Sequence, residues 1–401
     1  MSFTGTFHAP LVDDQLDYLR LAQNLATGAG FVDNFGPTVN RFPFYPIFLA
    51  VIEWLFGSSP EVIRVAQAGL AALGVPLIWF IGTSAGPRGA GCIAALLYAV
   101  NPFVMRPTRF IHTESLLSFL LLIMGTVCMM CLRSREHTGR WVAVLGVVLG
   151  LCVLTRGQIL LCAVLVTPWL CVVLRDRLRP IRTAALMWTA LMLVLAPWVV
   201  RNWIEFERFI PLTAGYGSSS GGYVFWSSNN ALAATPGDLW GAWVHHDILP
   251  EAAEYEALPR TDPTFLEGKA YEYGFRFLSS RPDLIPSLLL GKTVRFWRYH
   301  EPLEDGQQGS QALLLTMTLT LLPFGALGLS YQLHNLRRCF PFLAIVGAVF
   351  ISTLIYWGDT RFRAPIEPYI TLTVAIGMAS LAAVIHATRL LWRQNRGALQ
   401  D

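Results

Sequence analysis

The sequence predicts an all-α protein that crosses a membrane several times. Of its 401 residues, 54% are hydrophobic and only 14% are charged, and the mean hydropathy is +0.48. An ordinary soluble domain carries about 25% charged residues. One crossing of a hydrocarbon core takes about 20 apolar residues, and this chain is long enough for several crossings. The composition therefore argues against a soluble enzyme, a disordered chain and a nucleic-acid-binding protein.

Nine apolar stretches are the candidate spans found with a window of about 19 residues. They cover residues 60–84, 89–105, 114–132, 141–154, 157–174, 183–200, 311–331, 340–358 and 365–388. The fourth and fifth stretches are short and are broken only by the Thr-Arg-Gly sequence at 155–157. We interpret this pair as a hairpin.

The arginines predict the orientation of these spans, because short cytoplasmic loops carry an excess of positive charge. If the chain starts outside, every short basic loop falls inside. These loops contain Arg88, then Arg133, Arg135 and Arg140, then Arg175, Arg177, Arg179 and Arg182, then Arg337 and Arg338, and finally Arg389, Arg393 and Arg396.

This orientation divides the chain into four parts. Residues 1–59 form a first extracytoplasmic loop with juxtamembrane helices, and residues 60–200 contain the first six spans. Residues 201–310 form a large extracytoplasmic loop region, and residues 311–401 contain the last three spans and a cytoplasmic tail. Chemistry is expected on the outer side, because the inner loops are too short to hold a site.

The segment 42–56, FPFYPIFLAVIEWLF, is apolar but short, and it contains prolines and Glu53. Counting it as a span would place every later arginine cluster outside. We therefore expect a juxtamembrane helix along the outer interface. Trp54 and the neighbouring aromatic residues suit the headgroup level.

Three weaker signals point to structure more than to chemistry. The seven cysteines lie in or beside apolar runs, so no disulfide framework is implied and the Cys128/Cys131 pair is expected to pack as small hydrophobes. His245, His246 and Asp247 have side chains that bind metals, but adjacent loop histidines are usually solvated. No glycine-rich loop of the kinds that cradle nucleotide phosphates occurs in the sequence.

Two acidic residues on the outer side are the leading candidates for chemistry. Asp14 lies in VDDQLDYLRLAQNLATGAGF, where Asp13 or Asp14 can also start a short amphipathic helix. Glu114 lies at the outer mouth of the third span, where an acid also complements a helix dipole. An ionisable group at the edge of hydrocarbon is costly unless it is paired, and it often marks a functional cavity.

Many cations share this face, which departs locally from the positive-inside rule. Guanidinium groups bind phosphate oxygens bidentately, although long basic side chains also extend to lipid headgroups without further function. Headgroup contact explains Arg156 and Arg201 less well, since each borders an apolar run. The full set is Arg41, Arg106, Arg109, Arg156, Arg201, Lys292, Arg295, Arg298, Arg361 and Arg363.

With these residues in view, the sequence resembles the membrane-embedded GT-C glycosyltransferases that use polyprenyl-phosphate sugars, such as protein O-mannosyltransferases and aminoarabinose transferases. Each landmark is weak alone, and their common order is specific for the superfamily but not for a substrate. The landmarks are 14–18 (DQLDY), 24–31 (NLATGAGF), 41–46 (RFPFYP), 55–57 (LFG), Thr113 with Glu114, 154–156 (LTR), 197–202 (PWVVRN) and 358–365 (GDTRFRAP) with Glu367 and Pro368.

The resemblance implies a GT-C-like helix bundle with outer juxtamembrane helices, and an essential acid in the first outer loop, which Asp14 matches. Glu114 matches a second acid of such enzymes. The sequence departs from the family in one respect. The family normally begins with a membrane helix before the acidic loop, and here only about a dozen residues precede Asp13.

The implied activity is inverting transfer of a sugar from a polyprenyl-phosphate donor to an acceptor at the extracytoplasmic face of the bacterial inner membrane. Asp14 and Glu114 are the expected catalytic pair, with a divalent cation such as Mg²⁺ or Mn²⁺ as an open alternative at the same acids. The donor phosphate is expected at Arg156, Arg201, Arg361 and Arg363. The expected substrate-binding residues are Asp17, Tyr18, Arg41, His112, Asn202, Asn229 and Asn230.

The expected partners are the lipid-linked sugar, an acceptor that is a lipid, glycan or protein, and membrane lipids, with no nucleic acid. Two other functions remain open from the sequence. A flippase or transporter for lipid-linked sugars predicts ionisable residues midway along the spans, whereas here they cluster at the outer mouths. An inert membrane scaffold would bind lipid phosphate through the same arginines.

Overall fold

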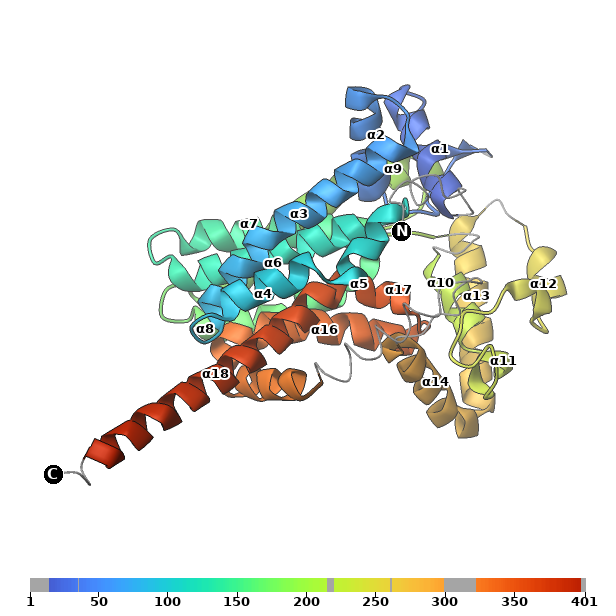
Figure 1. Cartoon of the computed structure of the whole chain (residues 1–401). Helices are drawn as coiled ribbons and strands as arrows, with labels where there is room; N and C mark the ends of the chain where they lie inside the picture. Colours follow the sequence, from blue (N-terminus) through green and yellow to red (C-terminus); the bar gives the residue numbers. More distant parts are fainter. Residues whose placement is uncertain (1–13, 35, 215–219, 260–261, 299–321, 398–401) are drawn as a thin grey trace.

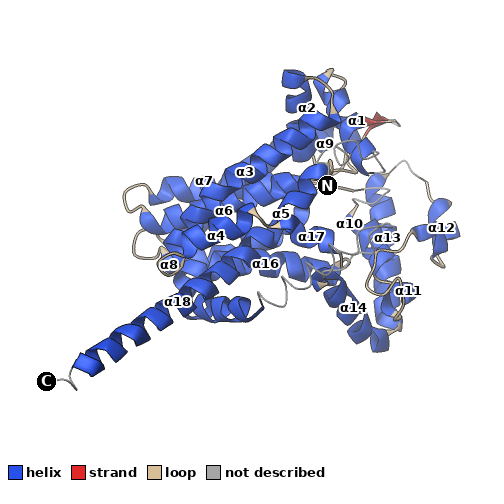
Figure 2. Cartoon of the chain, in the orientation of Figure 1, coloured by secondary structure: helices blue, strands red, loops and turns tan. Residues whose placement is uncertain are grey.

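The computed structural model describes residues 14–34, 36–214, 220–259, 262–298 and 322–397. Asp13 and most of the expected span 311–331 lie outside the described residues, although residues 322–334 are helical. Helices make up most of the described chain, and its one sheet is a two-stranded ribbon (Figure 2). The expected all-α polytopic membrane architecture is confirmed.

Six described helices are long and apolar enough to cross a membrane. They are α3 (Pro60–Ala85), α6 (Glu114–Arg133), α7 (Thr138–Thr155), α9 (Pro180–Phe206), α16 (Leu336–Ile355) and a continuous helical run, Thr360–Trp392, that contains α17 (Thr360–Arg363), η6 (Ala364–Ile366) and most of α18 (Glu367–Gly397). In Figure 1 these helices form a bundle, and α18 extends beyond it.

Two of the nine expected spans are not single long helices. The second is broken into α4 (Ala90–Ala99) and a run of α5 (Pro102–Met105) with η2 (Arg106–Arg109), bent by 57°. Pro102 has no N–H to continue the first helix, and the Asn101 side chain caps the second by accepting from the Phe103 N–H at 2.9 Å. The fifth, η3 (Gly157–Ile159) with α8 (Leu160–Val173), is apolar but short.

Small residues let the long helices pack closely. A Cβ added at Gly146 or Gly150 of α7 would collide with α9, at the Met187 carbonyl and the Val194 side chain respectively. Helices in a membrane associate through such close contacts, because lipid supplies no hydrophobic drive between them. The spacing of these two glycines therefore fixes how α7 lies on α9.

Two segments outside the bundle lie at one of its ends (Figure 1). The first contains α1 (Asp14–Ala26), the ribbon β1 (Val32–Asp33) and β2 (Gly36–Pro37), and α2 (Phe44–Phe56). The expected helix over 42–56 is present as α2, and it exposes Trp54 and Phe56 by 75% and 69%.

The second outer segment has its own small core, in which Tyr223, Trp226, Tyr255 and Tyr273 are buried together. Its helices are α10 (Gly221–Ser228), α11 (Ala231–Ala234), η4 (His246–Ile248), α12 (Ala252–Glu256), α13 (Pro263–Ser280), η5 (Pro282–Leu284) and α14 (Ile285–Trp297). The short basic connections between α6 and α7 and between α8 and α9 lie at the other end of the bundle (Figure 1).

Candidate functional site

Asp14 and Asp17 occupy one face of α1, where residues three apart are neighbours. Arg41, just before α2, reaches both of them. Its Nη2 lies 2.6 Å from Asp14 Oδ1 and 2.8 Å from Asp17 Oδ2. The guanidinium also stands 5.1 Å from the centre of the Tyr18 ring. One arginine therefore holds the acidic face of α1 against the start of α2.

Glu114 is the first residue of α6, and its side chain is only 2% exposed. Two guanidinium groups meet it. Arg361 Nε lies 2.5 Å from Glu114 Oε1, and Arg156 Nη2 lies 3.3 Å from the same oxygen. Burial of this acid at the end of a membrane helix is thus compensated by paired positive charge.

Arg361 joins the two acids. Its Nη1 lies 3.2 Å from Asp14 Oδ2 while its Nε contacts Glu114, although these acids are 347 and 247 positions away in sequence. The backbone of Arg361 is fixed by Asp359, whose side chain accepts from the Arg361 N–H at 2.7 Å as the N-cap of α17. Arg156 is held beside it, 4.6 Å above the Phe362 ring.

The acids and arginines form a balanced group, which we call the acid–arginine cluster and define as Asp14, Asp17, Glu114, Arg41, Arg156 and Arg361. It contains three carboxylates and three guanidinium groups. Burial opposes ionisation of Asp14, but Arg41 and Arg361 outweigh it and hold the pKa of this carboxyl well below its usual range. Asp14 is therefore ionised at neutral pH.

The accessible side of the cluster is formed by the first outer segment and Arg361. The side chains of Asp14, Asp17 and Arg361 are 26%, 48% and 28% exposed. Glu114 and Arg156 lie deeper, at 2% and 15%. Glu114 Oε2 has no hydrogen-bond partner among the described residues. An incoming anion can reach Arg361, whereas Glu114 is placed to hold the guanidinium groups from behind.

His112 lies within electrostatic range of both acids and of Arg361. Burial and the positive charge of Arg361 lower the pKa of His112 to about 4. Its imidazole is therefore neutral at pH 7 and offers one donor and one acceptor nitrogen.

The loop before α6 is tied to α1 by Gln15, a residue that the sequence interpretation missed. The buried Gln15 side chain accepts from the Ile111 N–H at 3.0 Å. This contact positions the turn that carries His112 and Glu114 against the helix that carries Asp14. A polar residue on the otherwise apolar buried face of α1 was the available signal.

Arg201 and Arg363 were also expected to bind the donor phosphate, but both lie outside the acid–arginine cluster. Arg201 donates to the backbone carbonyls of Phe31 and Thr38, each at 2.8 Å, and so fastens α9 to the first outer segment. Arg363 is 1% exposed, and its Nε lies 2.5 Å from Glu367 Oε1. Neither side chain joins the cluster in the described contacts, because each is engaged by its own surroundings.

The three asparagines expected to bind substrate are hydrogen-bonded to other parts of the protein. The buried Asn202 donates to the Ile210 carbonyl at 2.9 Å, and Asn230 caps α11 by accepting from the Ala233 N–H at 3.0 Å. Asn229 accepts from the buried Lys292 ammonium at 2.9 Å. These contacts of Asn229 and Asn230 lie within the second outer segment, and that of Asn202 joins α9 to the chain that follows it. None of these contacts reaches the acid–arginine cluster.

A resident divalent cation does not fit the cluster as it stands. Oxygen ligands such as Asp14 and Glu114 suit Mg²⁺ and Mn²⁺. Here the carboxylates are already matched in charge by three arginines, and Arg361 lies between Asp14 and Glu114. A dication added to this group would be repelled by the guanidinium groups. The arrangement is suited to exchanging a carboxylate for another anion.

Comparison with known proteins agrees with this fold. Residues 40–203 match the family model for dolichyl-phosphate-mannose-protein mannosyltransferase. No curated protein sequence matches the chain.

Two solved structures of an archaeal oligosaccharyltransferase from Archaeoglobus fulgidus are similar to the chain. The first, AglB with an inhibitory peptide and a dolichol-phosphate, has a TM-score of 0.56 at 16% identity and covers 98% of this chain and 49% of its own. The second, in complex with Zn and sulfate, has a TM-score of 0.53 at 14% identity and covers 94% of this chain and 46% of its own. The chain therefore spans about half the length of these relatives.

The apo structure of ArnT from Cupriavidus metallidurans covers 92% of this chain and 73% of its own, with 14% identity and a TM-score of 0.44. That score is too low to carry an argument. The AglB similarity, together with the family-model match, confirms the expected resemblance: the chain has the fold of the GT-C glycosyltransferases.

Proposed function

We propose that the protein is an inverting glycosyltransferase, which moves a sugar from a polyprenyl-phosphate donor to an acceptor at the outer membrane–water boundary. The observation that carries the proposal is the joint contact of Asp14 and Glu114 with Arg361. Two acids and an anion-binding group meet there from three distant parts of the chain. The family-model match and the AglB fold support the same activity.

The donor phosphate is bound by Arg361 and Arg156 in this proposal. Guanidinium groups form charge-assisted hydrogen bonds with phosphate oxygens in a fixed fork geometry. Arg361 is reachable, and Glu114 anchors both arginines through one carboxylate oxygen. A phosphate bound here is also the leaving group, and positioned positive charge stabilises it as it departs.

Binding of the donor also activates Asp14. The strong pairing that lowers its pKa makes the resting carboxylate a weak base. When the phosphate takes hydrogen bonds from Arg361, Asp14 loses one of its two partners and its pKa rises. The carboxylate then accepts the proton of the acceptor hydroxyl or amine, while that atom bonds to the anomeric carbon and the carbon–oxygen bond to phosphate breaks.

The acceptor is expected beside Asp17, Tyr18 and His112, on the exposed side of the cluster. Arg41 holds the acidic face of α1 during the reaction. Arg201, Arg363 and the three asparagines act in folding in this proposal, because their described polar contacts are with backbone groups and with side chains outside the acid–arginine cluster. The acceptor is a lipid, a glycan or a protein.

The site is expected to face the periplasm or the exterior of a bacterial inner membrane. Its end of the bundle carries both outer segments, and the opposite end carries the short basic connections (Figure 1). Short loops rich in arginine stay on the cytoplasmic side. The α2 helix, with Trp54 and Phe56 exposed, is placed along the outer interface.

The test uses Asp14→Asn and Glu114→Gln in purified protein in nanodiscs. The substrate is a radiolabelled polyprenyl-phosphate sugar, with an envelope extract as the source of acceptors. We expect Asp14→Asn to slow transfer by about 10²–10⁴-fold, the usual contribution of a general base. Glu114→Gln should weaken binding of the polyprenyl phosphate as well as transfer.

Asp176→Asn is the matched control, because its side chain is 82% exposed at the other end of the bundle. It should transfer sugar like the wild type. Transfer at wild-type rates by both Asp14→Asn and Glu114→Gln would refute the catalytic assignment. Donor binding without transfer by the wild type would instead favour the lipid-phosphate scaffold.

A further inference from the structure

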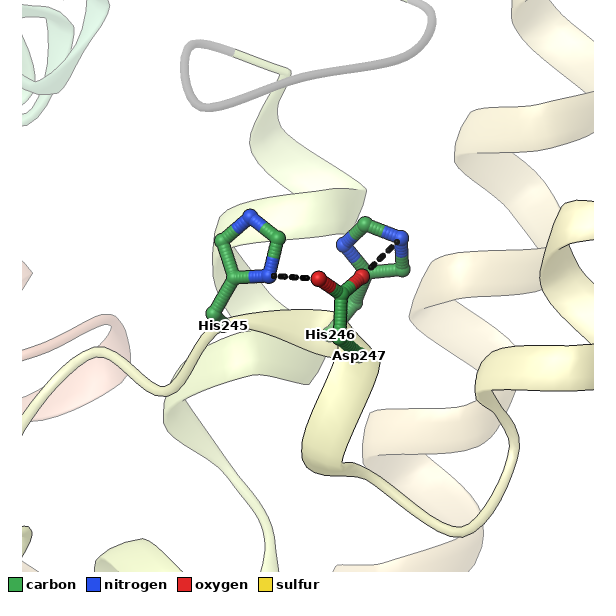
Figure 3. Close-up of side chains that lie close together, drawn as sticks. All are labelled: His245, His246 and Asp247. Carbon is green, nitrogen blue, oxygen red and sulfur yellow. Dashed lines mark ion pairs between the residues drawn. The ribbon is translucent and has the colours of Figure 1, made fainter.

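A second group of chemically competent side chains lies in the second outer segment, around η4. His245 Nδ1 is 3.0 Å from Asp247 Oδ2, and His246 Nε2 is 3.0 Å from Asp247 Oδ1. Figure 3 shows the carboxylate of Asp247 between the two imidazole rings. One potential ligand atom from each residue lies within 4.8 Å of the others.

Glu256, on α12, adds a fourth donor. Its Oε1 lies 2.5 Å from His246 Nε2. Two imidazole nitrogens with one or two carboxylates make a donor set that suits Zn²⁺ and related divalent transition metals. Ligand atoms 3.0 Å apart subtend an angle of about 90° at an ion with bonds of about 2.1 Å. That angle is compatible with a distorted coordination geometry.

The orientation of the His246 ring is fixed by a hydrogen bond on its other nitrogen and by the aromatic rings around it. Its Nδ1 lies 2.7 Å from the Tyr223 hydroxyl, and its side chain is 6% exposed among Tyr223, Trp226 and Tyr255. Nε2 is thereby directed toward the two carboxylates. A hydrogen-bonded partner on the far ring nitrogen is the usual support of a histidine that ligates a metal.

The carboxylates of Asp247 and Glu256 converge on this ring, and Asp247 also reaches the neighbouring His245. His246 Nε2 faces Asp247 at 3.0 Å and Glu256 at 2.5 Å, yet a ring nitrogen carries at most one hydrogen. Two negative groups therefore converge on His246 Nε2, which can donate to one of them at a time, while the other oxygen of Asp247 faces His245 Nδ1 at 3.0 Å. A dication in place of that proton satisfies both carboxylates and both imidazoles.

We infer that His245, His246 and Asp247, with Glu256, form a binding site for a divalent transition metal of the Zn²⁺ class. It lies in the second outer segment and takes no part in the glycosyl transfer proposed above. His245 and Asp247 are 53% and 66% exposed, so the ion enters from solvent and water fills the remaining positions. Metal binding would join η4 to α12 and brace the small core around Tyr223 and Trp226.

The experiment measures Zn²⁺ binding to the full chain in nanodiscs, purified with an affinity tag that contains no histidine. Metal content after dialysis and titration calorimetry give the stoichiometry and the affinity. We expect one Zn²⁺ per chain, and the double variant His245→Asn with Asp247→Asn should lose that ion. Both substituted side chains are exposed, so the fold is expected to persist.

His137→Asn is the matched control, because His137 is exposed in the connection between α6 and α7. It should bind Zn²⁺ like the wild type. Tyr223→Phe keeps the ring but removes the hydroxyl behind His246, and it should weaken binding by about 10-fold. Two results would overturn the inference. One is a wild-type protein that holds no more Zn²⁺ than the double variant, and the other is a double variant that binds Zn²⁺ as tightly as the wild type. Sugar transfer by the same variants is measured in parallel. Because the metal site takes no part in transfer, the inference and the proposed function can fail independently.

Discussion

Two charged groups at the same end of the bundle contrast in how they are built. Arg363 and Glu367 form a local pair, four residues apart in sequence, with side chains 1% and 6% exposed. Arg363 also lies 4.9 Å from the Phe103 ring. The acid–arginine cluster instead joins residues from distant parts of the chain, and several of its side chains are reachable from solvent.

The two groups differ in how far water can reach the paired charges. In the buried pair, each charge depends on its partner, since water cannot replace it. In the cluster, Arg361 divides its donors between Asp14 and Glu114, and a dissolved anion can compete for the outer of these contacts. Proximity in sequence to Arg361 therefore does not give Arg363 the same contacts.

The largest effect on folding is expected from breaking the buried pair. Glu367→Gln leaves the Arg363 charge without its carboxylate, which should lower the free energy of unfolding by about 3–5 kcal/mol. Asp17→Asn removes a pair that is half exposed and should cost about 0.2–1 kcal/mol. Unfolding by SDS in mixed micelles measures both, and equal losses in the two variants would remove the contrast.

A smaller but more specific effect is expected on donor binding. Arg361→Gln should weaken equilibrium binding of a polyprenyl phosphate by about 10- to 100-fold, because a hydrogen bond to a charged group is worth about 1.5–3 kcal/mol. Arg361→Lys keeps the charge without the fork and should fall between this variant and the wild type. Arg88→Gln, an exposed change at the opposite end, should bind like the wild type. Unchanged binding by Arg361→Gln would place the phosphate elsewhere.

The most gradual effect concerns Lys292, a buried cation whose Nζ donates to Asn229 Oδ1 at 2.9 Å and to the Leu354 carbonyl at 3.0 Å. Burial lowers the pKa of Lys292 to about 7 from an ordinary value near 10.5. The unfolded chain therefore binds more protons between these two values, and stability rises with pH in that window.

The free energy of unfolding of the wild type relative to Lys292→Met should thus increase from pH 7 to pH 10. The slope is at most about 1.4 kcal/mol per pH unit, which is reached where the unfolded chain holds one more proton than the folded chain. Comparison with the variant cancels the titration of other groups. A difference that stays constant or falls over this range would show that the ammonium remains charged in the folded state.

Much of the architecture was predictable because hydropathy follows the chain locally. The expected stretch 60–84 became α3, and 114–132 became α6. The count of nine spans exceeds the six long helices and one bent pair found among the described residues. The apolar composition of residues 89–105 and 157–174 predicted a span in each, but neither the short length of α8 nor the bend at Pro102 follows from composition alone.

The candidate site was predictable in part, for the same reason. Residue type and position on the expected outer side selected Asp14, Glu114, Arg156 and Arg361, which the structure brings together. Arg363 was separable in principle, since Glu367 one helical turn later offers a partner. The carbonyl partners of Arg201 were not foreseeable, because backbone groups carry no signature of where they will lie.

By itself, the sequence determined that this chain buries long apolar helices, keeps its arginines at their ends and places acids where hydrocarbon meets water. Those properties depend on the cost of charge in lipid, which acts on each segment separately. Only the tertiary structure decided which charges meet. Pairing depends on close packing between remote segments. This packing brings Arg361 to both acids and places Arg363 and Arg201 against other partners.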